Sequence, residues 1–197
     1  MTGRSDGPDS VPARVDAAMR ATPRRAFLPS AVRRLAEHDE PIPIGGGQTN
    51  SQPSTVRDML CLLEVRDGDR VLDVGAGSGW TTAILAALTG PAGAVFGVER
   101  LPELAEAAAR RLAGVDRPWA RVQTARPGVL GAPEHGPYQR ILVSAESDWV
   151  PPELVAQLAD GGVMVLPVDR RLCVVRRSGA AVETEEVGWY RFVPLIR

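Results

Sequence analysis

The chain has 197 residues, 44% of them hydrophobic, which is enough for one α/β domain with a buried core and too few for two ordinary domains. Its formal net charge of -1, from 23 basic and 24 acidic residues, argues against nucleic acid and anionic membranes as partners. Every basic residue is arginine, which excludes Schiff-base chemistry and a P-loop lysine. With a polar start and no membrane-length apolar run, the chain is expected to be cytoplasmic.

The N-terminal part is predicted to be helical. Residues 1–10 are expected to be disordered, and residues 11–197 are expected to form one domain. Across residues 11–69, apolar residues recur at helical spacing between segments rich in proline and glycine. The helices expected there cover residues 11–21, 30–38 and 53–65.

From residue 70 to residue 197, short β-rich runs alternate with alanine-rich helical runs, which is typical of a parallel sheet wound with helices. The strands expected are 70–74, 94–98, 120–124, 138–144 and 162–168, and the helices between them are 79–88, 101–113 and 151–159. Three further strands, at 171–179, 181–187 and 189–196, would give the sheet an antiparallel end. The predicted fold class is therefore α/β, with a doubly wound, mostly parallel, Rossmann-like sheet.

The segment RVLDVGAGSGW, residues 70–80, carries the densest chemical signal. A strand is predicted to end at Val74, glycines follow, and a helix begins at once, so a close-approach loop stands at the carboxyl end of the first strand. The dinucleotide fingerprint requires a glycine at position 80, which is Trp80, so NAD is disfavoured. Glu99 ends the next strand and is suited to accept hydrogen bonds from both hydroxyls of a ribose.

A second segment, IGGGQTNSQP at residues 44–53, reads as a flexible glycine-rich loop that ends in amides and hydroxyls. It contains no acid, base or metal ligand. Elsewhere, Cys61 and Cys173 lie in apolar runs and are expected to be buried thiols, not disulfide or zinc ligands. His38 and His135 lie in polar loops and are expected to be solvated. No metal site is predicted.

The pattern D-x-G-x-G-x-G resembles motif I of the class I methyltransferases, which bind S-adenosylmethionine. Six segments, in order from about residue 12 to residue 195, make the whole chain resemble the protein-L-isoaspartate O-methyltransferase family. These segments are AMRATPRRAFLP, PIPIGGGQTNSQP, VLDVGAGSGW, GVER, GGVMVLPV and FVPL. The resemblance implies an enzyme that esterifies isoaspartyl or aspartyl carboxylates of proteins or peptides. The chain is expected to be a monomer, and its charge predicts no nucleic acid or membrane partner.

The resemblance also implies which residues form the site. The catalytic residues would be Ser51 and Thr49. The cofactor, S-adenosyl-L-methionine, would be bound by Asp73, Gly75, Ala76, Gly77, Ser78, Gly79, Glu99 and Arg100. The substrate would be contacted by Gln48, Asn50, Gln52 and Glu146.

Methyl transfer to a carboxylate explains the chemistry of the 44–53 segment. Carboxyl groups titrate near pH 4, so the nucleophile is already ionised at neutral pH and no general base is required. The site must align an oxygen with the methyl group and remove part of its water, and such alignment can contribute roughly 7 to 11 kcal/mol. The hydroxyls of Thr49 and Ser51 can bind the carboxylate without the strong clamp of a basic group.

Three departures from the family pattern keep two alternatives open. Arg126, Pro127 and Gly128 replace glycine-aspartate-glycine, which removes an acid expected near the adenine. Gln139 stands where an aspartate is usual, and the segment SAESDWV brings Glu146 towards the pocket in place of small residues. The alternatives are a methyltransferase with a different acceptor and a non-catalytic descendant of the fold that binds peptides.

Overall fold

The computed structural model describes residue 7 and residues 9–196. The first helix, α1, spans Val11–Arg20, and the hydroxyl of Ser10 accepts a hydrogen bond from the backbone N–H of Ala13 at 3.3 Å. The expected disorder through residue 10 is therefore wrong for Ser10, because its side chain satisfies a donor that the helix leaves free. The other residues before residue 9, apart from residue 7, lie outside the described residues.

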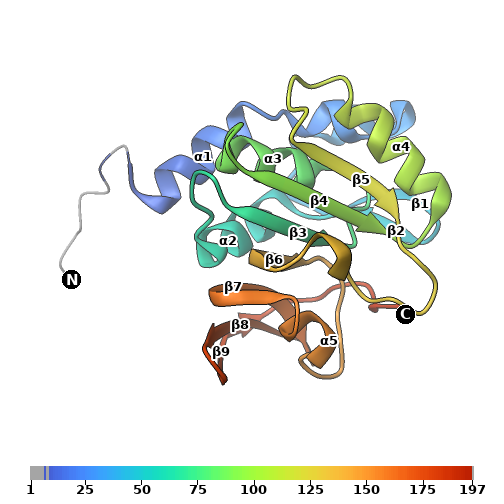
Figure 1. The fold of residues 1–197 in the computed structure, drawn as a ribbon. Coiled ribbons are helices and arrows are strands. Elements are labelled where there is room, and N and C mark those ends of the chain that lie inside the picture. Colours follow the sequence, from blue (N-terminus) through green and yellow to red (C-terminus); the bar gives the residue numbers. More distant parts are fainter. Residues whose placement is uncertain (1–6, 8, 197) are drawn as a thin grey trace.

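A seven-stranded sheet forms the centre of the fold. Its strands are β3 Arg70–Val74, β4 Ala94–Glu99, β5 Ala120–Thr124, β6 Tyr138–Val143, β7 Leu158–Val168, β8 Arg171–Ser178 and β9 Ala181–Trp189. They lie in the order β5-β4-β3-β6-β7-β8-β9 (Figure 1). Strands β3 to β7 run parallel, while β8 and β9 are antiparallel to their neighbours. The predicted α/β fold with an antiparallel C-terminal end is thereby confirmed.

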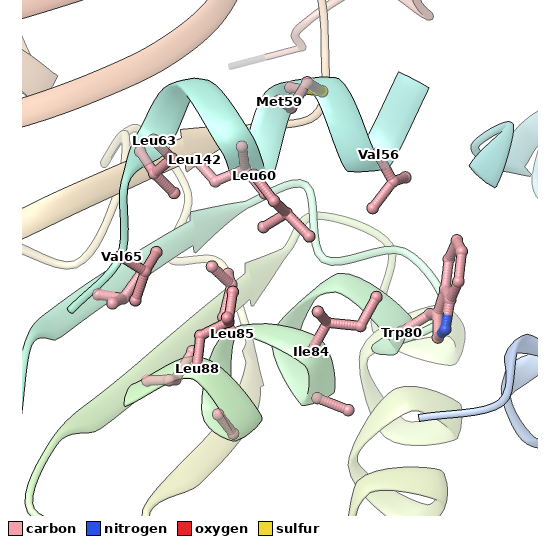
Figure 2. Close-up of a cluster of buried hydrophobic side chains, with 14 of the residues drawn as sticks. Val56, Met59, Leu60, Leu63, Val65, Trp80, Ile84, Leu85, Leu88 and Leu142 are labelled. Carbon is pink, nitrogen blue, oxygen red and sulfur yellow. The ribbon is translucent and has the colours of Figure 1, made fainter. Parts of the chain in front are cut away.

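The helices lie mainly on one face of this sheet. After α1 they are α2 Pro53–Leu63, α3 Trp80–Thr89, α4 Pro102–Leu112 and α5 Pro152–Val155, with 3-10 turns at Arg24–Phe27, Ser30–Leu35 and Pro133–His135. The first four helices share one hydrophobic core with the sheet, and Figure 2 shows Leu60 of α2 pointing towards Ile84 and Leu85 of α3. These three side chains are fully buried, and each such burial contributes about 1.5 to 3 kcal/mol. Short α5 and the loop before β6 cover the opposite face.

Three expected elements differ from the structure because long-range contacts use their backbone. The helix expected at 151–159 ends early, since the carbonyl of Gln157 accepts from the backbone N–H of Tyr138 and draws the chain into β7. The helix expected at 30–38 is only a 3-10 turn, and the carbonyl of His38 accepts from Arg24. The strand expected at 189–196 is absent from the described chain beyond Trp189, and the segment instead crosses to residue 146.

Strand β9 is one edge of the sheet and is exposed along almost its whole length. It carries three exposed large apolar side chains, Val182, Val187 and Trp189, together with three glutamates. The cysteine prediction holds for Cys173, which is buried, whereas Cys61 is half-buried. In the described part of the chain, no helix has both the length and the apolar character needed to cross a membrane.

Candidate functional site

A cavity of about 470 Å³ opens at the carboxyl ends of β3, β4, β5 and β6, where open α/β sheets bind ligands. Its lining comes from segments far apart in the sequence: 48–51, 74–78, 80–81, 98–102, 124–131, 144–145 and 193–196. The residues 75–79, called the glycine loop below, and the 44–53 segment therefore meet at one cavity. This meeting is the geometric condition for transfer of a group between ligands bound by the two segments.

The glycines of the glycine loop have different physical roles. A Cβ on Gly75 would meet nothing closer than 3.8 Å, so its backbone is open to a ligand. A Cβ on Gly79 would lie 3.1 Å from the Cβ of Ala108, so this glycine permits close packing of α3 against α4 and does not line the cavity. The structure therefore gives Gly79 a packing role, and its expected contact with the cofactor stays a prediction.

Glu99 lies at the cavity wall at the end of β4 and is only 6% exposed. Its Oε2 accepts a hydrogen bond from the backbone N–H of Gly77, and its Oε1 accepts one from the backbone N–H of Leu101, both at 2.9 Å. A carboxylate has about four lone-pair sites, so each oxygen can accept a further hydrogen bond. Two backbone donors thus hold the carboxylate in place and leave it able to bind a pair of hydroxyls.

Asp73 was expected to contact the cofactor, but it lies behind the glycine loop. It is fully buried, and its Oδ2 accepts from the hydroxyls of Thr81 at 2.8 Å and Thr82 at 2.6 Å. Its Oδ1 has no hydrogen-bond partner within the described chain. Burial, more than the nearby charge of Glu99, raises the pKa of Asp73 to about 6. The side chain ties the end of β3 to the first turn of α3.

The segment expected to be a flexible loop is a two-stranded hairpin, with β1 at Ile42–Gly45 and β2 at Gln48–Asn50. Residues 42–51 are called the hairpin below. The turn needs glycine because Gly46 and Gly47 have φ values of +59° and +74°. A Cβ on Gly46 would lie 2.5 Å from a methyl carbon of Leu101, so the tip rests against the second residue after β4.

Sequence reasoning missed Arg24, which holds the hairpin in place. Its side chain is buried, and its donors reach the carbonyls of His38, Glu40, Asn50 and Ser51 at 2.8 to 2.9 Å. Its Nε donates to Oδ1 of Asn50 at 2.5 Å. Within the described chain no carboxylate pairs with this guanidinium, and burial lowers the pKa of Arg24. The only sequence signal was an arginine in the partly apolar run RRAFLP.

Trp80 anchors the same region from the side of the glycine loop. Its ring lies 5.5 Å from the guanidinium carbon of Arg24, a distance suited to cation–π attraction. Its indole N–H donates to the carbonyl of Thr22 at 2.9 Å. The residue that breaks the dinucleotide fingerprint is therefore the one that binds the N-terminal segment to α3.

Thr49 and Ser51, the expected catalytic residues, both line the cavity. Among the described residues neither hydroxyl has a hydrogen-bond partner, so both are free to bind a ligand. Gln48 also lines the cavity, whereas Gln52 does not: its amide donates to Asp39 at 3.1 Å. The hydroxyls expected to act on the substrate are thus available at the cavity wall.

Glu146 is not part of the cavity wall. Its backbone N–H donates to the carbonyl of Val193 and its carbonyl accepts from the N–H of Leu195, so it holds the C-terminal segment over the cavity. The cavity wall does include Arg100 and Arg126, together with Pro127 and Gly128. Arg126 donates to Glu134 at 2.9 Å.

The described residues contain no cluster of acids, histidines and cysteines suited to hold a metal ion. His38 is exposed, as expected, and lies outside the cavity wall. His135 is half-buried, because its ring stacks on Phe96 at 4.6 Å and contacts Arg121. The expectation of a solvated side chain is wrong for His135, and it too lies outside the cavity wall.

Residues 10–197 match the family model described as Protein-L-isoaspartate(D-aspartate) O-methyltransferase. The chain is 47% identical over 189 residues to a protein-L-isoaspartate O-methyltransferase of Aeropyrum pernix, and the match covers 93% of this chain and 72% of that protein. It is 41% identical over 181 residues to the protein of the same name from Methanocella arvoryzae, covering 90% of this chain and 96% of that protein.

Solved structures show the same relationship in three dimensions. One protein-L-isoaspartate O-methyltransferase has a TM-score of 0.82 with 26% identity, and the match covers 95% of this chain and 62% of that chain. A Plasmodium falciparum protein assigned to the same activity was solved in complex with S-adenosyl-L-homocysteine. It has a TM-score of 0.78 with 21% identity and coverage of 93% and 90%, which shows likeness of fold.

Proposed function

The chain belongs to the protein-L-isoaspartate(D-aspartate) O-methyltransferase family, and from this membership we propose how its cavity carries out the reaction. The chain is an S-adenosyl-L-methionine-dependent O-methyltransferase that esterifies isoaspartyl carboxylates. The acceptor is an isoaspartyl, or aspartyl, side chain in a protein or peptide. The observation that carries the proposed mechanism is the single cavity lined by both the glycine loop and the hairpin.

The residues around the glycine loop fit the cofactor. The volume of about 470 Å³ lies in the range of small-molecule and cofactor sites. The open backbone at Gly75 permits close approach, and the fixed carboxylate of Glu99 can accept from two ribose hydroxyls. When bound, S-adenosyl-L-methionine supplies an electrophilic methyl group. Gly75, Ala76, Gly77 and Glu99 would hold it, with Arg100 at the rim.

The hairpin binds and orients the acceptor. A carboxylate is ionised at neutral pH, so no residue has to remove a proton before methyl transfer. The free hydroxyls of Thr49 and Ser51 donate hydrogen bonds to one carboxylate oxygen and leave the other as nucleophile. The two cationic residues of the wall, Arg100 and Arg126, lie outside the hairpin, so the carboxylate is not neutralised by a tight ion pair.

The product is a methyl ester, in which a poor leaving group has become a good one. The neighbouring backbone nitrogen attacks the ester carbonyl, methanol leaves, and a succinimide forms without further help from the protein. Hydrolysis of the succinimide then returns some normal aspartate. Repair or maturation of proteins follows from this sequence of steps.

We further propose that the chain works as a monomer in the cytoplasm, without nucleic acid or membrane partners. The formal net charge of -1 supports the absence of both partners, because neither phosphate backbones nor anionic lipids would be attracted. Sedimentation at micromolar concentration tests the monomer, and a dimer mass would overturn it.

A labelled-methyl assay on two matched peptides tests the proposed acceptor. The peptides share one sequence and differ only in an isoaspartyl or aspartyl linkage, and we expect labelled ester on the isoaspartyl peptide in large excess. Calorimetric titration with S-adenosyl-L-homocysteine provides the control for an intact cofactor site. Binding of the cofactor product without methyl transfer to either peptide would indicate another acceptor, and no binding at millimolar concentration would indicate a non-catalytic protein.

A further inference from the structure

Three contacts join the hairpin to the cofactor side of the cavity, two on the glycine loop and one just beyond β4. Ile44 packs on Gly77, where a Cβ would lie 3.3 Å from the Ile44 methyl carbon, and the hairpin tip at Gly46 rests on Leu101. Both are apolar contacts, which resist separation but allow sliding. The third contact is a hydrogen bond, and among the described residues it is the only direct hydrogen bond between the hairpin and the glycine loop.

Asn50 makes this third contact with one end of its amide and binds Arg24 with the other. Its Nδ2 donates to Oγ of Ser78 in the glycine loop at 2.8 Å, and its Oδ1 accepts from Nε of Arg24. Asn50 is 5% exposed and Ser78 is 3% exposed, so water does not compete for either bond. The Asn50 amide therefore links the buried Arg24 charge to the cofactor side of the cavity.

Alternation along β2 places the reacting hydroxyls opposite this link. Successive side chains of a strand point to opposite sides, so Asn50 points inward while Thr49 points to the other side; Ser51 follows directly after the strand and also lines the cavity. The burial supports this, since Asn50 is buried, Thr49 is exposed and Ser51 is half-buried. A movement of Asn50 thus moves both flanking hydroxyls with it.

We propose that Asn50 is a positioning residue that couples the hairpin to the glycine loop, so that cofactor binding fixes the hydroxyls of Thr49 and Ser51 for methyl transfer. The assignment rests on the proposed function and gives Asn50 a different role from the substrate contact expected from the sequence. A displacement of about 1 Å at a reacting group can cost roughly a hundredfold in rate. The Asn50–Ser78 bond prevents such a displacement.

Two single variants and their combination test the coupling. Asn50→Leu keeps the side-chain volume and removes both hydrogen bonds, while Ser78→Ala removes only the bond to the glycine loop. With an isoaspartyl peptide, we expect each substitution to lower kcat by roughly tenfold to a hundredfold, where kcat is calculated for the protein molecules that can bind the cofactor. The kcat of the double variant should be little lower than that of the less active single variant, because both substitutions remove the same link.

Hydrogen exchange provides a readout that does not depend on catalysis. In the parent protein, S-adenosyl-L-homocysteine should slow exchange of the hairpin amides at residues 42–51 by about fivefold or more. In Asn50→Leu this response should disappear, while the affinity for S-adenosyl-L-homocysteine should change by less than about threefold. Asn50→Asp offers acceptors to Arg24 and to the Ser78 hydroxyl. This variant should therefore recover part of the parental kcat and part of the exchange response.

The control is Gln139→Leu, which removes another amide at the opposite end of the sheet. The Gln139 side chain accepts from the backbone N–H of Arg70 at 2.9 Å, far from the cavity wall. This variant should keep the parental kcat and exchange response. A lowered melting temperature in Asn50→Leu with parental kcat and exchange response would reduce Asn50 to a structural residue and overturn the proposal. If Asn50→Leu fails to fold, Ser78→Ala decides by the same two readouts.

The two proposals fail in different ways. A parent protein that methylates neither peptide contradicts the proposed function, yet its exchange response to S-adenosyl-L-homocysteine still tests the coupling. An active parent with unaffected variants contradicts the coupling and leaves the function in place.

Discussion

The glycine loop and the hairpin line the same cavity, but different kinds of group hold them in place. The glycine loop is bound by its own strands: the backbone N–H groups of Gly75 and Ala76 donate to the carbonyl of Val98, and that of Gly77 donates to Glu99. The hairpin depends on one buried guanidinium, that of Arg24, which reaches carbonyls up to 27 residues away. Mostly backbone hydrogen bonds at the ends of neighbouring strands build the cofactor side, and one buried side chain builds the acceptor side.

The largest effect is expected when the support of the hairpin is removed. Arg24→Ala leaves buried and part-buried carbonyls and the Asn50 amide oxygen without this donor, and a loss at a buried group costs about 1 to 3 kcal/mol. We expect the free energy of unfolding to fall by about 3 to 5 kcal/mol, measured by urea denaturation. Methyl transfer should fall by more than about a hundredfold, because the hydroxyls lose their placement.

Its matched control is Arg25→Ala, at the next position in the chain. Arg25 is exposed and its side chain donates to the carbonyl of Arg33 at 3.1 Å. The change in unfolding free energy should stay within about 0.5 kcal/mol. Equal stability of the two variants would contradict the role given to Arg24.

On the cofactor side, the buried Asp73 makes stability depend on pH. Its pKa is about 6 in the folded protein against an ordinary value of 3.8, so the folded state binds more protons than the unfolded state between these values. The contribution of Asp73 to the free energy of unfolding is fully present below about pH 4 and is lost as the pH rises through 6. Asp73→Asn should equal the parent near pH 4 and exceed it by roughly 3 kcal/mol at pH 7.

Urea denaturation across pH 4 to 7.5 measures this difference between Asp73→Asn and the parent. Taking the difference cancels the contribution of Asp16 to the pH dependence. The hydrogen bond to Arg57 lowers the pKa of Asp16, so its effect on stability has the opposite sign. A constant difference across the range would show that Asp73 is ionised throughout.

A smaller effect is expected from the acceptor hydroxyl itself. Ser51→Ala removes one hydrogen bond to the substrate carboxylate, and bonds to charged groups contribute about 1.5 to 3 kcal/mol. We expect kcat/KM for the isoaspartyl peptide to fall by roughly tenfold to a hundredfold, with an unchanged affinity for S-adenosyl-L-homocysteine. Ser54→Ala, three residues further and outside the cavity wall, is the control and should remain near the parent. Unchanged kinetics in Ser51→Ala would remove that hydroxyl from the mechanism.

The smallest effect is expected at Arg126, in the part of the cavity wall that follows β5. Its ion pair with Glu134 is largely exposed, and such pairs contribute about 0 to 1 kcal/mol. Arg126→Ala should change the affinity for S-adenosyl-L-homocysteine by less than about threefold in calorimetry. A loss of more than about tenfold would mean that Arg126 leaves Glu134 and stacks on the adenine.

The contrast between the two sides explains what the sequence could predict. Strand ends, glycine spacing and the acid at position 99 are local features, so the sheet and the cofactor side followed from periodicity and spacing. The hairpin was read as a loop because its strands are short and rich in glycine. Its pairing depends on Arg24, and no local pattern shows that an arginine will be buried against carbonyls from distant segments.

The same limit applies near the C-terminus and at α5. Helical spacing over 151–159 was overridden when Gln157 joined its carbonyl to Tyr138 of β6. The β-rich run after Trp189 left the sheet to pair with the backbone of Glu146, a residue that is not part of the cavity wall. In each case a tertiary hydrogen bond decided between two local conformations of similar propensity.

The exposed edge strand β9 has a consequence for how copies of the chain meet. An unpaired edge of nine residues invites a second copy to extend the sheet. If two copies joined antiparallel about its midpoint, Glu185 would face its own counterpart, and like charges directly opposite each other repel. The acidic side chains thus act as a barrier to sheet-to-sheet fusion. This barrier matters for a protein whose proposed substrates are themselves damaged, extended chains.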